Sequence, residues 1–311
     1  MKLIWEWQRS LPMEFNTQFF TQLLVNGLII GTLYGVVAMC FVLIYKATQV
    51  VNFAQGEFLL IGAWLCWTAA VSYEMPFMVA FLVSLVAMFV FGYLLQSVVL
   101  RPLLGQPIIS IIMVTIGFSM VFQSTVKWIF GVTPVVYPEV LPGLSTEIFG
   151  LYIKSAQVLS LISSVIIMTG FYYFFKHTRW GLAMRATAYN PQIAQSLGIP
   201  VRTVFAMSWA ISAAVSGLAG VILGVTNGVS SELSFMGIKV FPAVIVGGLD
   251  SIVGAVVGGL IIGVLENMAE FLDVEYLRWG NLYTVAPFYV LMLILLIRPN
   301  GLFGSKNVER I

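Results

Sequence analysis

The stretch GGLDSIVGAVVGGLIIGVLEN, residues 247–267, places a polar turn directly before an apolar, glycine-rich run. Two passes through a bilayer must fit into the apolar segment 239–271, and they fit only if the chain turns at 247–251. The first limb, 239–246, is too short for a span of about 20 residues. Non-helical backbone at membrane depth is tolerated only where protein or a water-filled cavity satisfies its polar groups. We therefore predict a broken or re-entrant helix that lines a pathway.

The composition is that of a membrane protein with several spans. Of the 311 residues 60% are hydrophobic and 9% are charged, and the mean hydropathy is +0.99. A net charge of +2 is too small to indicate nucleic acid as a partner. Cys40 and Cys66 lie within apolar runs, which indicates buried thiols and neither a disulfide framework nor a zinc site. The N-terminal segment 1–21 contains two glutamates and is unlike a secretory signal.

The apolar runs predict an all-α fold, a polytopic transmembrane helix bundle of about eight spans with broken or re-entrant helices. One of the nine runs is then a half-span. The runs lie at 22–45, 54–72, 76–100, 108–130, 156–175 and 204–225, with two more in 238–271 and a last at 283–297.

Charged residues set the expected orientation, because Lys and Arg accumulate in short cytoplasmic loops. If successive spans alternate, the basic groups on one side are Lys46, Arg101, the acid-free cluster of 176–203, Arg298, Lys306 and Arg310. The acidic residues on the other side are Glu74, Glu139, Glu147, Glu232, Asp273 and Glu275. We therefore expect a membrane domain at 22–298, a cytoplasmic loop at 176–203, a cytoplasmic tail at 299–311 and an N-terminus outside.

Glycine spacing predicts close helix packing. Glycines recur every four residues in two apolar runs, where they let helix backbones approach each other. They are Gly27, Gly31 and Gly35 in the first run and Gly220, Gly224 and Gly228 in the sixth. The two runs are expected to point in opposite directions and each precedes an apolar segment with polar residues in it, so they also suggest an inverted repeat.

Catalytic signatures are absent from the sequence. It has no G-x-x-x-x-G-K-[ST] phosphate loop and no H-E-x-x-H motif, and its single histidine, His177, lies in the basic cluster. An enzyme is therefore the weakest of the functional classes, and no catalytic or metal residues are assigned.

A few polar side chains within the apolar runs are the candidates for a pathway, since polar groups at membrane depth face protein or water. Structural bracing is the competing interpretation for both Glu57 and Glu266, neither of which has an evident Lys or Arg partner within the membrane. With the glycines of the expected turn, the pathway candidates are Asn52, Gln55, Glu57, Gln123, Gly247, Gly248, Glu266 and Asn267.

The basic cluster contains a short predicted helix. Pro191 suits the first turn of a helix that runs to about Leu197 before Gly198 ends it. Ile193, Ala194 and Leu197 recur at three- and four-residue spacing and would form a small apolar face. Such a face indicates a protein partner, whereas a solvated connector explains the charges but not the helix.

The chain resembles the permease subunits of the branched-chain amino acid ABC importer family. The resemblance lies in NGLIIGTLYGVVA (26–38), VNFAQGEFLLIGAW (51–64), GLAMRATAYNPQIAQSLGI (181–199), the stretch 247–267 and RPNGLFG (298–304). These stretches cover almost the whole membrane region in the family's order, whereas the loop at about 131–155 carries little of the resemblance.

The resemblance implies the bacterial inner membrane and several partners. Two ATPase subunits would bind ATP and Mg, so that this chain binds no cofactor itself, and a second, related permease and a periplasmic binding protein would complete the importer. Segment 185–199 resembles the family's cytoplasmic coupling loop. The residues carried over to coupling are Arg185, Ala186, Asn190, Pro191, Ile193, Ala194, Leu197, Gly198 and Ile199.

The substrate stays open at this point. Branched-chain or other hydrophobic amino acids are expected, and relatives that handle urea, short amides or aromatic or dicarboxylic acids are the alternatives. A stand-alone channel or facilitator is the competing class, although such a protein needs no docking helix. The membrane lipid is a further expected contact of the chain, and nucleic acid is not.

Overall fold

The computed structural model describes residues 17–103, 106–138, 145–148 and 151–304. Helices make up the bundle, and a two-stranded antiparallel hairpin lies outside it, with Ser145 opposite Lys154. The first half of the bundle comprises α2 (Thr17–Thr48), α3 (Gln55–Trp67), α4 (Phe77–Leu94) and α5 (Ile108–Phe130). The hairpin, β1 (Ser145–Ile148) and β2 (Leu151–Lys154), leads into α6 (Ser155–His177).

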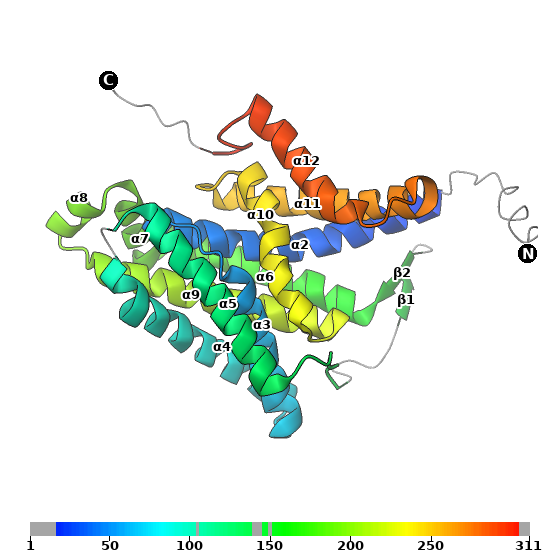
Figure 1. The fold of residues 1–311 in the computed structure, drawn as a ribbon, viewed down its shortest axis with the longest axis horizontal. Coiled ribbons are helices and arrows are strands. Elements are labelled where there is room, and N and C mark those ends of the chain that lie inside the picture. Colours follow the sequence, from blue (N-terminus) through cyan, green and yellow to red (C-terminus); the bar gives the residue numbers. More distant parts are fainter. Residues whose placement is uncertain (1–16, 104–105, 139–144, 149–150, 305–311) are drawn as a thin grey trace, which may run out of the picture.

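Two short helices, α7 (Arg179–Tyr189) and α8 (Pro191–Ser196), connect the halves and lie at the left edge of the view in Figure 1. The second half comprises α9 (Val201–Asn227), α10 (Phe235–Gly247), α11 (Ile252–Leu272) and α12 (Leu282–Ile297). Short helical segments of other types adjoin several α-helices. Those at Thr68–Ser72, Leu95–Leu100 and Asp273–Leu277 are π-helical, and those at Arg101–Leu103 and Ser231–Ser234 are 3₁₀ turns.

Six helical segments of the described chain are long and apolar enough to cross a membrane. They are Phe20–Thr48, Phe77–Leu103, Ile108–Phe130, Ser155–His177, Val201–Asn227 and Ile252–Leu277. In the most apolar window of α2, 89% of residues are buried, against 11% in α5. A helix that is apolar all round and buried belongs in the centre of the bundle, so α2 is central and α5 is peripheral.

Two predicted spans are instead half-helices. The run 54–72 and the first limb of 239–271 form α3 and α10, with 13 residues each. At 1.5 Å per residue 13 α-helical residues are about 20 Å long, and even with the π-helical turn Thr68–Ser72 that continues it α3 is shorter than the roughly 30 Å hydrocarbon core. A non-helical segment leads the chain back into the bundle before each half-helix, and we call it a return. The return before α3 is 49–54, and the return before α10 is 228–230, followed by the short turn Ser231–Ser234. The sequence predicts broken or re-entrant helices, and α3 and α10 are such helices among the described residues.

The two half-helices begin against each other. A Cβ built on Gly237 of α10 would lie 2.6 Å from the nitrogen of Gly56 in α3, so neither position has room for a side chain. The two half-helices leave this contact towards different neighbours, because α3 packs along α9 and α10 packs along α11. If α2, α3 and α4 of the first half are matched with α9, α10 and α11 of the second, the contact of α2 with α11 corresponds to the contact of α9 with α4. This correspondence fits the predicted inverted repeat.

The glycine ladder of α2 forms the contact with α11, and the two helices run side by side in Figure 1. A Cβ on Gly27 would lie 2.8 Å from the Cα of Val264, and one on Gly31 would lie 2.8 Å from the Cα of Leu260. A Cβ on Gly263 of α11 would collide with the backbone of Gly31. Glycine on both sides therefore brings the two backbones into contact, as expected for small residues at four-residue spacing.

The predicted turn lies between α10 and α11. Gly248 has φ +107°, in the region that favours glycine, and the Ser251 hydroxyl accepts the Gly254 N–H at 3.0 Å to cap α11. The carbonyl oxygens of Val246 and Gly247 accept the N–H groups of Leu302 and Phe303 at 2.8 and 3.1 Å. The segment after α12 thus holds the turn in place.

The turn lies at an end of the bundle, because Lys46 at the end of α2 also contacts the turn. The breaks in the interior of the bundle are the non-helical segments before α3 and α10.

An ion pair joins α10 to α11. The Lys239 Nζ lies 2.9 Å from Glu266 Oε1, and the two side chains are 28% and 10% exposed. The Tyr34 hydroxyl of α2 donates to Glu266 Oε2, and Lys239 Nζ lies 5.1 Å from the ring centre of Tyr283 in α12. The expectation that Glu266 has no lysine partner is therefore wrong. Because α10 begins at Phe235 and not at 239, Lys239 lies inside the helix and faces α11.

We expect Gly263→Ala to lower stability by about 1–3 kcal/mol, because its methyl group collides with the α2 backbone and the helices must separate. The midpoint of thermal unfolding in detergent measures this. The matched control is Gly170→Ala in α6, where a Cβ meets nothing within 4 Å. An equal effect of the two changes would contradict the packing argument.

We expect Lys239→Met to destabilise the chain by on the order of 3 kcal/mol, since it leaves the Glu266 carboxylate buried without its cation. The double variant Lys239→Met/Glu266→Leu removes both charges and should regain much of the loss. Thermal unfolding of the two single variants and the double variant measures the coupling. Additive losses would show that the pair does not act as a unit.

Candidate functional site

The half-helix junction, residues 52–57 and 234–237, has a buried side that contains Asn52, Gln55, Glu57 and Ser234. The Asn52 side chain accepts the N–H of Ala54 at 3.0 Å and donates to Gln55 Oε1 at 3.0 Å. Gln55 in turn donates to the hydroxyls of Ser212, at 3.1 Å, and Ser216 in α9. Both Asn52 and Gln55 are fully buried. The bond to Ala54 satisfies one backbone donor of the non-helical return before α3, as backbone at membrane depth requires, and the other bonds satisfy the buried side-chain amides.

Glu57 lies in the first turn of α3 and is 3% exposed. The Ser119 hydroxyl of α5 donates to its Oε1 at 3.0 Å. Its Oε2 is buried and has no hydrogen-bond partner among the described residues. A carboxylate at a helix N-terminus is favoured by the helix dipole, but a buried unsatisfied oxygen is costly. Glu57 is therefore the junction residue with an unused acceptor.

Gln123 connects α5 to the other half-helix. Its Nε2 donates to the Ser234 hydroxyl at 2.9 Å, and its Oε1 accepts from Lys127 Nζ at 3.2 Å. Ser119, Gln123 and Lys127 recur every four residues, so one polar stripe of α5 covers the starts of both α3 and α10.

An apolar surface lies beside the junction. Phe53, Phe235 and Ile238 are 37%, 55% and 57% exposed, and Phe53 contacts the ring of Phe241 at a centroid distance of 5.7 Å. The N-termini of two half-helices, which carry partial positive charge, thus begin next to exposed apolar side chains. Such an arrangement suits a molecule with an apolar side chain and a carboxylate.

The remaining pathway candidates lie outside the junction. Glu266 bonds to Lys239 and Tyr34, and the Asn267 amide donates to the Gly263 carbonyl of its own helix at 3.2 Å. Gly247 and Gly248 lie in the turn between α10 and α11. The structure therefore brings Asn52, Gln55, Glu57 and Gln123 to one place and leaves the other four apart from it. The pathway roles stay predictions.

The predicted short helix is present as α8. The Asn190 side chain accepts the N–H groups of Gln192 and Ile193 at 2.9 and 3.0 Å, and Pro191 occupies the first turn. Gly198 ends the element with φ +83°. α7 precedes it, capped by the Thr178 hydroxyl, which accepts the Gly181 N–H at 3.0 Å. Local capping chemistry therefore explains both helices.

Exposure divides the residues of α8. Ile193 and Leu197, the residue after the end of α8, are 53% and 75% exposed, and Tyr189, the last residue of α7, is 90% exposed. These three side chains, spaced by four residues, are defined here as the α8 ridge. Ala194 is 1% exposed, so the expectation that it shares an exposed face with Ile193 and Leu197 is wrong. The Ala194 side chain is buried because α8 packs on α7 and α9.

The other coupling candidates surround the α8 ridge. Arg185 donates to the Phe175 carbonyl at the end of α6, while Ala186 and Ile199 are half-buried and Pro191 is exposed.

Sequence reasoning missed several partners of the predicted residues. Ser212 and Ser216 lie one turn apart on α9, and this polar stripe in an apolar run was a visible signal of a buried contact. Lys239 was treated as a boundary of the apolar segment, and no local pattern indicates its pairing with Glu266. Ser119 and Ser234 carry no sequence signal that distinguishes them from other serines in the runs.

Comparison with known proteins assigns the chain to a family. The model of the branched-chain amino acid transport system permease component matches residues 23–297. The chain is 32% identical to the high-affinity branched-chain amino acid transport system permease protein BraD of Pseudomonas aeruginosa, over 94% of this chain and 98% of the relative. It is 30% identical to LivH of Escherichia coli over the same shares.

A solved structure, PsaBC from Streptococcus pneumoniae in complex with Fab, is similar over 96% of this chain and 97% of that chain, at 14% identity and a TM-score of 0.49. The near full-length match to the family model and to BraD, together with the six long apolar helices, decides the assignment. This multi-pass inner-membrane chain belongs to the branched-chain amino acid transport system permease family.

Proposed function

We propose that this chain is the permease subunit of an ATP-binding-cassette importer and forms half of the path for branched-chain or other hydrophobic amino acids. Two ATPase subunits, a second related permease and a periplasmic binding protein are its proposed partners. The proposal also places the C-terminus and α7–α8 in the cytoplasm and the N-terminus in the periplasm. The α8 ridge is the observation that carries it.

The α8 ridge has the properties of a docking element. Three large exposed side chains lie along α8 and the end of α7, on a segment, 176–203, that contains four Lys or Arg and no acid. In the bundle the helix is held by α7 and α9, so a force on α8 reaches the long helix α9 directly. An ATPase groove that closes around the ridge would thus bias the packing of α9 against α3 and α4, a two-state change with different contacts in each state.

The half-helix junction is the proposed part of the substrate path. A second permease would face the exposed apolar residues beside it and complete a channel between the two subunits. The amino acid side chain would contact Phe235 and Ile238, and its carboxylate would pass the N-termini of α3 and α10. Lys127, the cation beside the junction, already donates to Gln123 and lies near the Glu57 carboxylate, so the proposed path binds substrate weakly and the binding protein selects it.

Docking is tested by placing a charge on the α8 ridge. Burying an aspartate without a partner costs on the order of a few kcal/mol, so Ile193→Asp or Leu197→Asp should weaken ATPase binding about tenfold or more. Gln195→Asp adds the same charge on the opposite side of α8 and is the matched control. Co-purification of the ATPase subunits and ATP hydrolysis in nanodiscs provide the measurements.

Wild-type values for both ridge variants would overturn the docking proposal, and flux of leucine through liposomes with this chain alone would favour a stand-alone channel. Ala194→Asp is unsuitable as a test, because it would place the charge inside the chain.

The turn at Gly248 provides a second test. We expect Gly248→Leu to abolish leucine uptake, because a side chain there is strained by φ +107° and meets the backbone of Gly304 at 2.5 Å. Gly131→Leu is the matched control, since Gly131 at the end of α5 has a similar φ of +81° and open space around it. Uptake of labelled leucine at equal membrane expression is compared. Normal uptake by Gly248→Leu would separate the turn from transport.

A further inference from the structure

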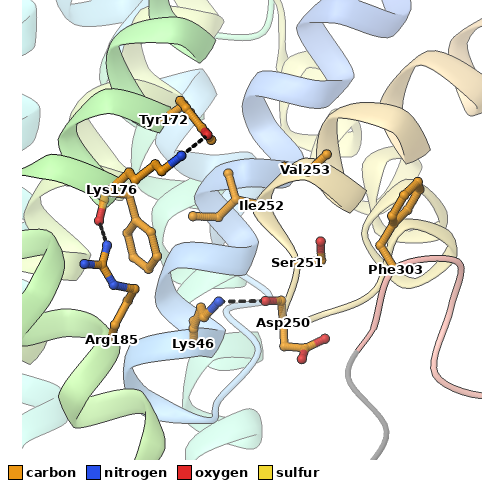
Figure 2. A pocket seen from close by; sticks show the side chains of 10 residues that line it. Lys46, Tyr172, Lys176, Arg185, Asp250, Ser251, Ile252, Val253 and Phe303 are labelled. Atoms are coloured by element: carbon orange, nitrogen blue, oxygen red, sulfur yellow. Dashed lines mark hydrogen bonds between the residues drawn. The ribbon is translucent and has the colours of Figure 1, made fainter.

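A pocket of about 420 Å³ lies where α2 and α6 end, and it is separate from the half-helix junction. Its wall is formed by the ends of these helices, by α7, by the turn between α10 and α11 and by Phe303 after α12. Figure 2 shows that side chains from all these elements surround one space. The proposed orientation places this end of the bundle at the cytoplasmic face of the membrane.

Three cations line the pocket, namely Lys46, Lys176 and Arg185, and one carboxylate, that of Asp250. Lys46 Nζ donates to the main-chain oxygen of Asp250 at 2.9 Å and also interacts electrostatically with the Asp250 carboxylate. Three positive charges against one negative charge leave the wall with a net positive charge. Like charges held together at a partly buried site repel each other, and a bound anion would remove that cost.

The cations are held in place by neutral groups. The Phe175 ring lies between two of them, with Lys46 Nζ 5.4 Å and Arg185 Cζ 5.6 Å from its centre. Lys176 Nζ bonds to the Tyr172 hydroxyl at 2.9 Å, and Arg185 bonds to the Phe175 carbonyl. Since each of these bonds uses one N–H of its cation, further N–H donors remain for a ligand.

The first turn of α11 adds backbone donors. Ser251, Ile252 and Val253 line the pocket, and the Ser251 hydroxyl caps the N–H of Gly254. The N–H groups of the first turn have no acceptor within the helix, so those of Ile252 and Val253 are available beside the cations. Cations together with such N–H groups bind phosphate oxygens well.

The rim of the pocket is amphipathic. Tyr172 of α6 and Val253 of α11 are 41% and 52% exposed, and α6 continues from the pocket with the exposed apolar residues Ile166 and Ile162. A free phosphate would use the cations but not this apolar surface. An anionic phospholipid uses both, because its acyl chain can follow α6 while its headgroup enters the pocket.

We propose that this pocket binds the phosphate headgroup of an anionic phospholipid of the cytoplasmic leaflet. The lipid contacts the end of α2, the end of α6 and the turn between the half-helix α10 and α11. It also contacts Arg185 of α7, so it bridges the membrane part of the chain to the segment that carries α8. This site requires only that the chain spans the membrane with this end at the headgroups.

Lipid retention tests the site directly. The full chain, purified from the membrane, is exchanged into nanodiscs of phosphatidylcholine with phosphatidylglycerol, and the lipids retained after transfer to detergent are counted by native mass spectrometry. Lys46→Gln and Lys176→Gln each remove one cation. Arg101→Gln removes an exposed cation at the same end of the bundle, outside the pocket, and is the matched control.

Wild type and Arg101→Gln should retain phosphatidylglycerol in preference to phosphatidylcholine. Each pocket variant should lose about fivefold in this preference, since a basic residue near an anionic headgroup contributes on the order of 1 kcal/mol. Lys176→Arg keeps the charge and should retain the lipid. Lys176 is exposed, so its variants test the site even if Lys46→Gln folds poorly.

Equal retention by Lys176→Gln, Lys46→Gln and Arg101→Gln would overturn the proposal. Displacement of phosphatidylglycerol by inorganic phosphate at equal concentration would also overturn it, because the pocket would then recognise a free anion. A loss of uptake in the ridge variants has no bearing on this measurement, so failure of the lipid site and failure of the proposed function are distinguishable.

Discussion

The contact of Gly56 with Gly237 is the one on which the rest of the bundle depends. It allows two half-helices to begin against each other, and a side chain on either residue would drive α3 and α10 apart. Each half-helix then needs a non-helical return through the bundle, and each return must satisfy its backbone polar groups from the protein. In the first return, the Asn52 side chain accepts the N–H of Ala54, the Thr115 hydroxyl accepts the N–H of Phe53, and the Asn52 carbonyl accepts the N–H of Gln55.

The same geometry distinguishes residues whose polar atoms are already bonded from a residue with an unused acceptor. Residues that close hydrogen-bond networks, such as Gln55 and Glu266, hold helices to one another, and their polar atoms are already used. The starts of α3 and α10 differ, because their N-terminal dipoles lie beside exposed apolar side chains and an unused oxygen of Glu57. Such a surface favours weak binding of a passing substrate over a tight binding site. Proposed selection by a separate binding protein is consistent with this chemistry.

The end of the bundle where α2 and α6 finish has a different character. There the charges concentrate, and the α8 ridge and the basic pocket share the α7 segment through Arg185. The turn after α10 lies in the same region. A change in α8 and a change in the lipid environment would therefore act on neighbouring parts of one structure. α8 packs on α9, which packs along the half-helix α3, and the pocket includes the turn that follows the half-helix α10.

The sequence by itself determined the features that depend on local chemistry. Apolar run lengths predicted a membrane bundle, Asn190, Pro191 and Gly198 predicted α8, and the glycines of 247–251 predicted the turn. Tertiary structure alone decided that 54–72 is a half-helix, that Lys239 neutralises Glu266 and that Ala194 points inward. The physical reason is that hydropathy and capping act within a few residues, whereas pairing, burial and helix contact depend on backbones that the chain brings together from distant positions.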